Sequence, residues 1–531
     1  ETNLKDKIFL RNNIFYSFAI DSSNQYANAG GEEAARYAAK KDLVAIKKLN
    51  NLDDGKVKYA MTTIVDYAGY RVVCQAPIPG VFNQVIPLQE EDFDENGQLK
   101  SEELSSRITE KVAYGFGDEF NKINDTKLFE KSFKTISDYF HLKKHTVWSQ
   151  SAEGEHSNVT ELVTSLDTKG LKGSDDRLYI IDMYKTTPLD IKFIEENCDE
   201  SKEDSYPFRQ VLLRHELVDE WFRRNVAKEI KAESEKLSDE DKSQEDGPKI
   251  TVDAAKFTFN PDAFSLKGKP EDLSAEQLKE VKEDEDCVRQ LGDFLHNTII
   301  EEFLADVFTG KAMVPLDGEH LTETLHKQGI NLRHLGLLAK KILESKAETE
   351  EKRKVELEQI AKDNELKEEE DKKKEAAKKE KEAQENDESK ETTEEAEEAE
   401  EDNSIFDMNK AAAAYNSFYK VIVQEVIART SKHVLRSLTD VAGIEFAPSI
   451  VSHFLNLLFG FEINSKPEFK LQGFLESAYD LSSPELAALN EKLSSLSTCD
   501  ALIALVSREA FKRFRLELSV ETIKKFIAFN P

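Results

Sequence analysis

Three histidines in one short segment are the first side chains in this sequence that could do chemistry, because imidazole nitrogens are common metal ligands. The segment 315–336 reads PLDGEHLTETLHKQGINLRHLG and contains His320, His326 and His334. A metal site needs these side chains on one face, but Pro315 and Gly329 interrupt any shared helical face. We therefore expect this segment to belong to a folded scaffold and to hold no metal.

A second histidine pair lies in the segment HLKKH, residues 141–145. Residues four apart share one face of a helix, so the two imidazoles could bind one ion. A hydrolytic metal site also needs a glutamate that activates water, and neither this glutamate nor a third ligand is near in the sequence. The sequence therefore predicts no metal and no other cofactor.

Aspartates around a strand-like run raise nucleotide chemistry as an alternative. Asp175 and Asp176 precede the run RLYII, and Asp182 follows it. In protein kinases a strand presents an aspartate that holds magnesium beside the phosphates. A degenerate kinase-like nucleotide-binding protein or phosphotransferase would use these carboxylates. The sequence has no glycine-rich loop, no phosphate-binding loop and no nucleophile motif, so we expect a protein that is not an enzyme.

Arginine and lysine clusters are the candidates for contacting a polyanion, because the planar guanidinium can bind a phosphate through two parallel hydrogen bonds. Two clusters could bind RNA, and their members are Arg209, Arg214, Arg223 and Arg224 in the first and Lys512, Arg513 and Arg515 in the second. The alternative is that these side chains lie on solvated helix faces or pair with the abundant carboxylates.

The charge of the whole chain limits how RNA could bind. The chain has 531 residues and a formal net charge of −31. Residues 346–402 hold 25 acidic and 13 basic side chains, a net of −12, and the other −19 is spread over the remaining chain. An acidic protein repels nucleic acid at long range, so RNA binding would need a local basic face.

Cysteine spacing and hydropathy bear on the compartment. The four cysteines lie far apart and form no CxxC motif, so we expect a reducing, cytoplasmic location. The longest apolar run, residues 450–461, is interrupted by His453 and is too short to span a bilayer, so we expect no membrane insertion. The chain begins with Glu1 and shows no signal-peptide pattern, so we expect a fragment or a processed form.

The periodicity of apolar residues predicts an α+β protein, with a mixed N-terminal part followed by helices. Residues 1–55 read as an irregular, partly helical lead-in, and residues 56–82 as two strands joined by a turn at Ala68-Gly69. A helix is expected at residues 128–142, and short strands in HTVW, in ELVTSL and at residues 175–184. The helix expected at residues 206–230 carries the first arginine cluster and Trp221, which we place in the core.

A segment rich in glutamate and lysine separates two helical regions, which end near residue 345 and resume at residue 405. Residues 346–402 contain almost no aromatic side chain, so they bury too little surface to offset the entropy of ordering. We expect a disordered acidic insert, although its first half could form a solvated single helix.

Four segments, in the same order along the chain, resemble the Clu, or clustered mitochondria, family. They are VDYAGYRVVCQAPIPGVF (65–82), KGLKGSDDRLYIIDMYKTTPLD (169–190), LRHELVDEWF (213–222) and PLDGEHLTETLHKQGINLRHLG (315–336). Met183 and Lys185 depart from the residues usual in the family. The resemblance implies a lead-in at 1–55, an α/β half of the Clu domain at 56–205, its helical half at 206–345, an acidic linker at 346–402 and a C-terminal helical domain at 403–531.

The same resemblance implies a function that composition and spacing do not show. Clu proteins are cytosolic, prevent mitochondria from clumping, and bind mRNAs of nuclear-encoded mitochondrial proteins. The region after residue 405 resembles a helical segment linked to a translation initiation factor complex. The expected partners are therefore mRNA, that complex and ribosomes. We also expect a location in ribonucleoprotein granules, and an oligomer is possible. Neither a ubiquitin-like region nor a 34-residue repeat is recognisable, so we expect the central body of a longer protein.

Overall fold

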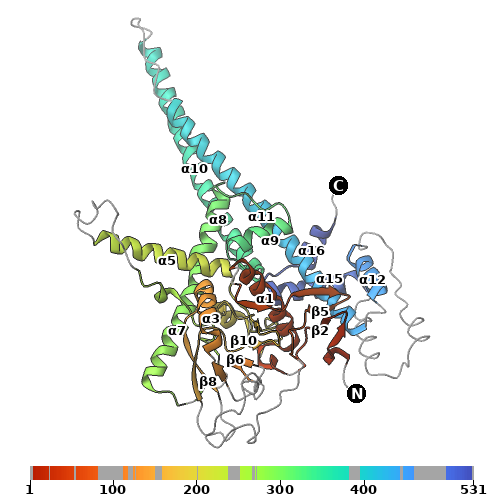
Figure 1. Ribbon diagram of the computed structural model, residues 1–531. Coiled ribbons are helices and arrows are strands. Elements are labelled where there is room, and N and C mark those ends of the chain that lie inside the picture. The colour runs from red at the N-terminus through yellow and green to blue at the C-terminus, as the bar shows by residue number, and fades with distance from the viewer. Residues whose placement is uncertain are drawn as a thin grey trace, which may run out of the picture.

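The computed structural model describes the chain over a set of ranges. These are residues 4–22, 24–52, 55–81, 112–117, 123–125, 127–149, 158–199, 201–236, 252–265, 269–270, 272–381, 395–442, 447–459 and 498–528. Strands and short helices from the first part of the chain pack beside helices from its last part, and two long helices project from this body (Figure 1).

The first sheet has four antiparallel strands in the order β1–β2–β5–β4. The strands are β1 (Phe9–Arg11), β2 (Ile14–Phe18), β4 (Thr62–Tyr67) and β5 (Tyr70–Gln75). Ala68 and Gly69 both have positive φ, as a two-residue hairpin turn requires, so the predicted turn is confirmed. The prediction of an irregular lead-in was wrong for β1 and β2, which form a hairpin around Asn12 and Asn13, also at positive φ.

The second sheet has five strands in the order β3–β11–β10–β6–β7. Its strands are β3 (Val57–Tyr59), β11 (Leu178–Ile181), β10 (Lys169–Lys172), β6 (Val112–Phe116) and β7 (Ile123–Asp125). Strands β3 and β11 are parallel, and the other pairs are antiparallel. Helix α3 (Lys127–Phe140) covers this sheet, because Phe133 packs against Tyr114 with ring centroids 4.1 Å apart. The expected short strand HTVW is confirmed as part of β8 (His145–Ser149), which pairs with β9 (Asn158–Leu162). The strand expected in ELVTSL, residues 161–166, was misplaced, because β9 begins at Asn158 and ends at Leu162.

Several helices lie between and after these strands in the sequence. They are α1 (Gly31–Leu52), α4 (Ile191–Asn197), α5 (His215–Glu235), α7 (Ala275–Phe294), α8 (Ile300–Phe308) and α9 (Gly318–Lys327). A π-helical turn, Leu295–Ile299, joins α7 to α8. The helix expected at residues 206–230 begins only at His215. The residues before it are not helical, because Leu212 pairs with Leu189 in an isolated β-bridge and Leu213 donates its backbone N–H to Pro188.

Two long helices, α10 (Leu335–Lys381) and α11 (Glu395–Ala442), pack side by side and form an arm beyond the body (Figure 1). Residues 346–381 are helical, which is the alternative that the sequence left open for the first half of the insert, whereas the prediction of disorder was wrong for 395–402, which are also helical. Alanine, glutamate and lysine have high helix propensity, and charge pairs four residues apart, such as Lys346 with Glu350, add to it. Residues 382–394 lie outside the described residues.

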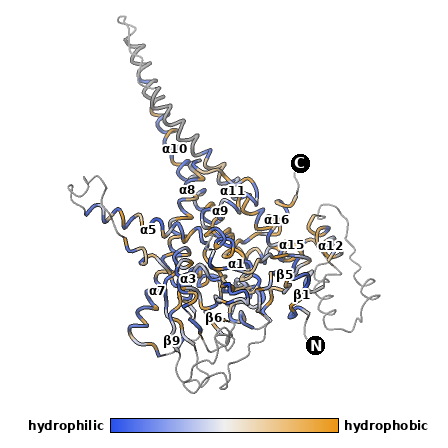
Figure 2. Tube along the Cα trace, in the orientation of Figure 1, coloured by the Kyte–Doolittle hydropathy of each residue, from blue (hydrophilic) through white to orange (hydrophobic). Residues whose placement is uncertain are grey.

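The last helices are α12 (Ala447–Phe459), α15 (Cys499–Phe514) and α16 (Val520–Ile527), and all three lie against α11 or α15. Helix α12 is mainly hydrophobic and α7 mainly hydrophilic (Figure 2). No helix among the described residues combines the length and the hydropathy that a membrane crossing needs.

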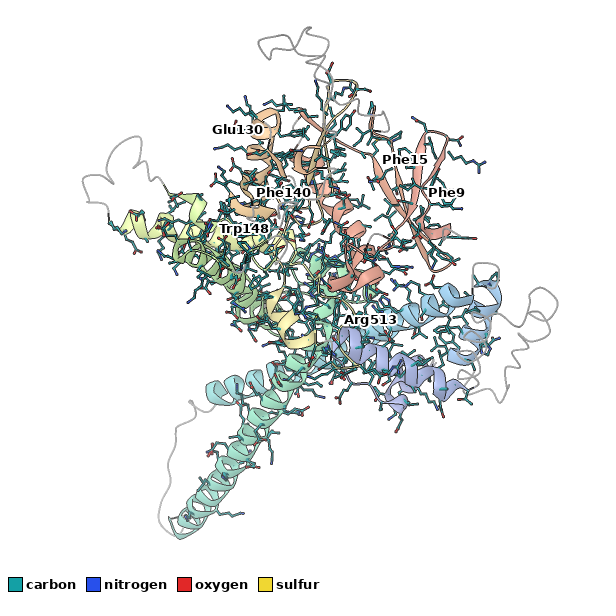
Figure 3. The ribbon with its side chains drawn as sticks, turned by 90° about the horizontal axis from the view of Figure 1, so that it is seen from below. Phe9, Phe15, Glu130, Phe140, Trp148 and Arg513 are labelled. Atoms are coloured by element: carbon teal, nitrogen blue, oxygen red, sulfur yellow. The ribbon has the colours of Figure 1, made fainter. Side chains whose placement is uncertain are left out.

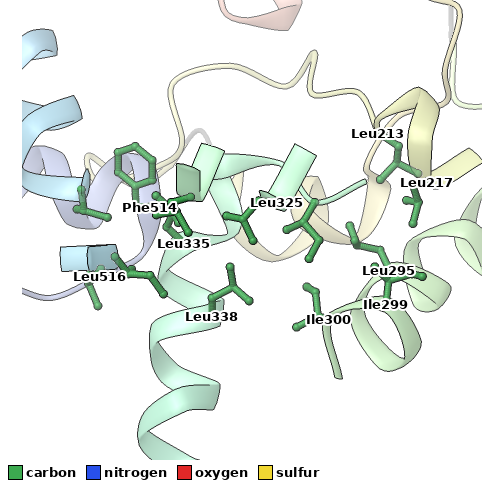
Figure 4. Close-up of a cluster of buried hydrophobic side chains, with 14 of the residues drawn as sticks. Leu213, Leu217, Leu295, Ile299, Ile300, Leu325, Leu335, Leu338, Phe514 and Leu516 are labelled. Carbon is green, nitrogen blue, oxygen red and sulfur yellow. The ribbon is translucent and has the colours of Figure 1, made fainter. Parts of the chain in front are cut away.

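One hydrophobic core joins the strands of the second sheet to the C-terminal helices. It runs from Ala45 in α1 to Ile527 in α16, and Figure 4 shows its central part around Leu217, Leu325 and Leu338. Trp221 belongs to this core and is 6% exposed, so its predicted burial is confirmed. The fold is α+β, as predicted, and its α/β and helical parts share one interior.

Candidate functional site

The first predicted arginine cluster is largely paired with carboxylates. Arg223 and Arg224 both contact Glu220 at 2.6 Å, and Arg224 also reaches Glu302 at 2.7 Å. Arg214 is the N-cap residue of α5 and pairs with Glu216. Arg209 lies before the helix, so the four arginines do not follow one helical face as the sequence predicted. Their charges are therefore compensated locally, which reduces their attraction for phosphate.

The second predicted cluster holds the end of α15 in place. Arg515 has a left-handed backbone at the C-cap of α15, and its guanidinium donates to Asn197 Oδ1 at 2.8 Å and to the Asp204 carbonyl at 2.7 Å. Arg513 pairs with Glu509 and Glu33. Lys512 has no ion pair among the described residues. Arg513 and Arg515 thus bind other parts of this chain.

The three aspartates of the nucleotide alternative do not converge. Asp175 and Asp176 lie in the turn before β11, where they pair with Arg177 and Lys172 respectively. Asp182 lies at the other end of β11 and is 3.6 Å from Lys169. A metal-bound phosphate needs carboxylates close together, so this arrangement offers no observation in favour of a nucleotide site.

The predicted histidines serve the scaffold. His320 accepts a hydrogen bond from the backbone N–H of Leu316, and His141 and His145 contact Asp219 and Asp262 on different elements. Burial lowers the pKa of His326 to about 3, with help from Arg214 and Lys40. His320 and His326 lie on α9 and His334 in the turn Leu332–His334. His141 and His145, which could have shared a helical face, lie beyond the end of α3.

A buried polar junction joins three of the four family-like segments, and sequence reasoning did not find it. Arg333 donates twice to Asp190 Oδ2, at 3.0 and 2.8 Å, and once to the Leu212 carbonyl at 2.7 Å. His334 Nε2 lies 3.0 Å from the same carboxylate oxygen, and the amide of Asn331 donates to Leu212. Asp190 ends the second segment, Leu212 adjoins the third, and the other three residues belong to the fourth. The junction therefore fixes these segments to one another.

Burial and ion pairing have opposite effects on the charge of Asp190 in this junction. Asp190 is fully buried, which opposes its charge, but Arg333 and His334 outweigh burial and hold the pKa of the carboxyl below its ordinary value. Asp190 also caps α4 by accepting from the Phe193 N–H. The sequence ended its second segment at Asp190 and its fourth at Gly336, but no local pattern links two residues that are 143 positions apart.

His296 extends the junction, and the three groups resemble a metal site at first sight. Single ligand atoms of Asp190, His296 and His334 lie within 4.8 Å of one another, and Nε2 of His296 is buried without a hydrogen-bond partner. Arg333, however, already donates twice to the carboxylate oxygen nearest His334. A divalent cation there would lie beside a buried guanidinium, so the donor set does not suit a metal.

A different group of cations gathers where α1, β5 and α11 meet. We define the cationic seam as Lys40, Arg71, Arg429 and Lys432. Arg71 pairs with Asp66 and Arg429 with Glu425, whereas neither Lys40 nor Lys432 has an ion pair among the described residues. Lys40 has an exposed side chain, yet burial of its ammonium, followed by Arg71 and Arg429, lowers its pKa to about 8.

Lys432 shows the same effect from the opposite side of the seam. Burial and the neighbouring Arg429 and Arg436 lower its pKa below the ordinary value. Lys40 and Lys432 therefore lie near other cations, and an anion bound there would favour the charged form of both ammonium groups. The sequence could not reveal this seam, because Lys40 and Lys432 come from opposite ends of the chain.

A cleft of about 470 Å³ lies beside the seam, between α1, α11 and α15. Glu33 of α1 contacts Arg436 of α11 and Arg513 of α15 across it. His433 lines the cleft with its Nδ1 buried and unpartnered, and burial followed by Arg513 holds its pKa far below the ordinary value. The cleft is therefore lined by charged side chains that join the first and last parts of the chain.

Two protein-family models match different parts of the chain, and the contacts described above join these two parts. The family model described as clustered mitochondria matches residues 1–193, and the model described as translation initiation factor eIF3 subunit 135 matches residues 312–530. No solved structure matches the chain. Asp190 thus lies at the end of the first match, and Arg333 and His334 near the start of the second.

Curated relatives align along nearly the whole chain. The clustered mitochondria protein homolog of Candida albicans is 42% identical over 96% of this chain, and that of Debaryomyces hansenii is 44% identical over 98%. The homolog of Aspergillus terreus is 28% identical over 97%. The chain spans 38%, 37% and 34% of the lengths of these three relatives. The chain belongs to the clustered mitochondria family.

Proposed function

We propose that this chain is the central binding scaffold of a cytoplasmic protein that contacts mRNA and the translation initiation machinery, and that it acts by binding and not by catalysis. In the whole protein this activity would serve mitochondrial distribution and the mRNAs of mitochondrial proteins. The support is family membership together with the match of residues 312–530 to an eIF3 subunit.

The observation that carries the proposal is that the two matched regions form one body. The buried junction ties Asp190 of the first region to Arg333 of the second, and Glu33 ties α1 to both α11 and α15. The large core also runs through both regions. A partner bound to the eIF3-like helices would therefore be held at a fixed position relative to the N-terminal sheets.

The cationic seam is one part of the described surface where lysines without an ion pair lie near arginines. Lys40 and Lys432 lack carboxylate partners, whereas Arg223 and Arg224 are paired with Glu220 and Glu302. A phosphate at the seam would meet two lysines that make no ion pair among the described residues, and it would compete with Asp66, which acts on Lys432. We therefore place RNA contact at the seam ahead of the arginines of α5.

Two charge-reversed variants separate these surfaces. Lys40→Glu with Lys432→Glu should weaken binding of a single-stranded RNA at least tenfold at low salt and should reduce the slope of log affinity against log salt. Arg223→Glu with Arg224→Glu, which carries the same charge change, is the matched control and should have the smaller effect. Both are read by fluorescence anisotropy, with circular dichroism to verify folding.

A larger loss of RNA affinity in the Arg223 and Arg224 variant than in the Lys40 and Lys432 variant would indicate that RNA binds at α5. An absence of RNA binding and of co-purifying initiation factor by the unaltered chain would contradict the proposed function itself. Co-purification with the initiation complex after RNase treatment tests the protein partner separately, because it excludes bridging by RNA.

A further inference from the structure

We infer that one face of the first sheet is a stacking surface for the bases of single-stranded RNA. This inference rests on the proposed function and adds its binding mode. Residues directly opposite in an antiparallel sheet share one face. The registers Phe9↔Tyr16, Phe18↔Val72, Val65↔Val72 and Tyr67↔Tyr70 therefore gather side chains of all four strands on one face. We call this the aromatic face, and its aromatic members are Phe9, Tyr16, Phe18, Tyr67 and Tyr70.

The aromatic face is open in the described structure. Tyr67 is 66% exposed and Phe9 41% exposed, and Ile14 and Val65 on the same face are 37% and 45% exposed. Cys74, which lies opposite Tyr16 on this face, is 8% exposed, but none of the five aromatic side chains belongs to a buried hydrophobic cluster of the described residues. Contacts between rings on neighbouring strands stabilise a sheet, but they do not require the exposure of Phe9 and Tyr67 at its two edges, and an exposed apolar group of this kind marks a binding surface.

The rings are arranged for contact through their faces and edges. Phe18 and Tyr70 meet edge to face, with centroids 5.7 Å apart, and the ammonium of Lys5 lies 5.2 Å from the Tyr70 ring. Figure 3 shows this sheet at the margin of the molecule, with Phe9 labelled on it. Aromatic platforms of this kind bind successive bases of any sequence, because every base has a flat π-face.

The charge of the sheet favours a nucleic acid over an apolar partner. Its strands and their flanks, residues 4–19 and 61–75, contain Lys5, Lys7, Arg11 and Arg71 against Asp6 and Asp66, a net of +2. Arg11 lies on the aromatic face itself, opposite Ile14. The rest of the chain carries −33. Lys5 pairs with Asp440 and Arg71 with Asp66, so Lys7 and Arg11 are the two cations of these segments that make no ion pair among the described residues.

The sheet also adjoins the cationic seam. Arg71 of β5 belongs to the seam and points from the opposite face toward α1, where it donates to the Arg36 carbonyl. Strand β4 is an edge strand, and Val65 and Tyr67 lie along it. A strand of RNA that crosses this edge would place bases on the aromatic face and phosphates near Lys432.

The test compares alanine variants on the two faces of the sheet, in the full chain. Phe9→Ala with Tyr67→Ala should lower the affinity for a fluorescein-labelled, single-stranded 12-nucleotide RNA by about tenfold or more. Tyr67→Phe keeps the ring and should retain affinity. Leu10→Ala is the matched control, because Leu10 neighbours Phe9, is 62% exposed and lies on the opposite face.

Four results would overturn the inference. Undiminished RNA binding by the folded Phe9 and Tyr67 double variant would place the bases elsewhere and leave the proposed function standing. Loss of a protein partner with RNA affinity intact would make the face a protein interface. Equal loss in Leu10→Ala would indicate a general effect on the sheet. An unaltered chain that binds no RNA would remove the proposed function together with the inference.

Discussion

At the scale of single residues, Asp190 and Arg333 show why the family-like segments have their sequence. Each alone is a buried charge, and each is acceptable only because the other is present. The segment NLRH therefore works through a partner that lies 143 residues earlier. The three histidines of residues 315–336 first suggested chemistry, but their segment contributes its polar groups to packing.

Removing one member of this pair should be costly. Asp190→Ala leaves Arg333 buried without a carboxylate and should lower the free energy of unfolding by about 3–5 kcal/mol. Glu302→Ala removes a partner of Arg224 at the surface and should cost at most about 1 kcal/mol. Urea denaturation followed by circular dichroism measures both. Similar small losses in the two variants would show that the junction is not a stabilising centre.

A second prediction at this scale concerns pH and Lys40. Phosphate favours the charged ammonium, whose pKa in the folded chain is about 8, so RNA affinity should fall as pH rises through 8. The groups that act on Lys40 are Lys41 on α1, Arg71 on β5, His326 on α9, and Arg429 and Lys432 on α11. The arginines stay charged in this range, and His326 is already neutral.

Lys40→Arg provides the control for that titration. Arginine keeps its charge to much higher pH, so the variant should retain its affinity between pH 7 and pH 9. Anisotropy titrations at several pH values, at constant ionic strength, make the comparison. An equal decline in the variant and the unaltered chain would assign the pH effect to another group.

Part of the site was readable from the sequence at the residue level. Glu220 precedes Arg223 and Arg224 by three and four residues, the spacing at which helical side chains pair, so the compensation of this cluster was visible in advance. The seam and the buried junction were not, because both depend on contacts between distant segments. Local patterns carry no information about which distant segments meet.

At the scale of elements, the arm shows where composition was misleading. Residues 346–402 lack core-forming side chains, which correctly indicated that they add little to the core. Low hydrophobicity does not prevent a helix when alanine, glutamate and lysine dominate and the partner helix lies alongside. The prediction of where α5 starts was wrong for the opposite reason. The apolar residues before His215 have helical spacing, but tertiary contacts with Leu189 and Pro188 hold them extended.

Most of the arm should be dispensable for folding. Thr349 contacts Tyr415, so antiparallel counting places residue 361 level with residue 403. Replacing residues 362–402 with a short glycine-serine linker should change the melting temperature by less than about 2 °C. Replacing residues 346–416 would also remove Tyr415, which packs on Phe308, and should destabilise clearly. A large loss in the shorter deletion would show that the arm is integral to the fold.

At the scale of the whole molecule, the tip of the β4–β5 hairpin is a close contact between the two matched regions. Gly69 has φ of +88°, and an added Cβ would lie 2.5 Å from the Thr439 hydroxyl of α11. The contact brings the aromatic face, the cationic seam and the eIF3-like helices into one arrangement. The hairpin itself was predicted from its sequence, but its contact with α11 was not.

Widening this contact should loosen one region from the other. Gly69→Val forces the hairpin away from α11 and should raise amide hydrogen exchange in residues 62–75 and 430–440. Gly31→Val is the matched control, because Gly31 also has a positive φ, +56°, and a Cβ there meets no atom within 4 Å. Unchanged exchange at both places in the Gly69 variant would mean that the contact contributes nothing to the joining of the regions.

The continuity of α11 has a mechanical consequence. This single helix lies in the arm at one end, crosses the core at Phe418 and Val426, and touches the hairpin tip at Thr439. Its 48 residues span about 72 Å as a stiff rod. The core holds the middle of α11 in place. A sideways force on the arm would therefore rotate α11 about the core and move its other end, which touches the hairpin. The part of α11 in the arm is longer than the part beyond the core, so the force at the hairpin would exceed the force on the arm. Whatever grips the arm therefore has a physical means of pulling on the sheet.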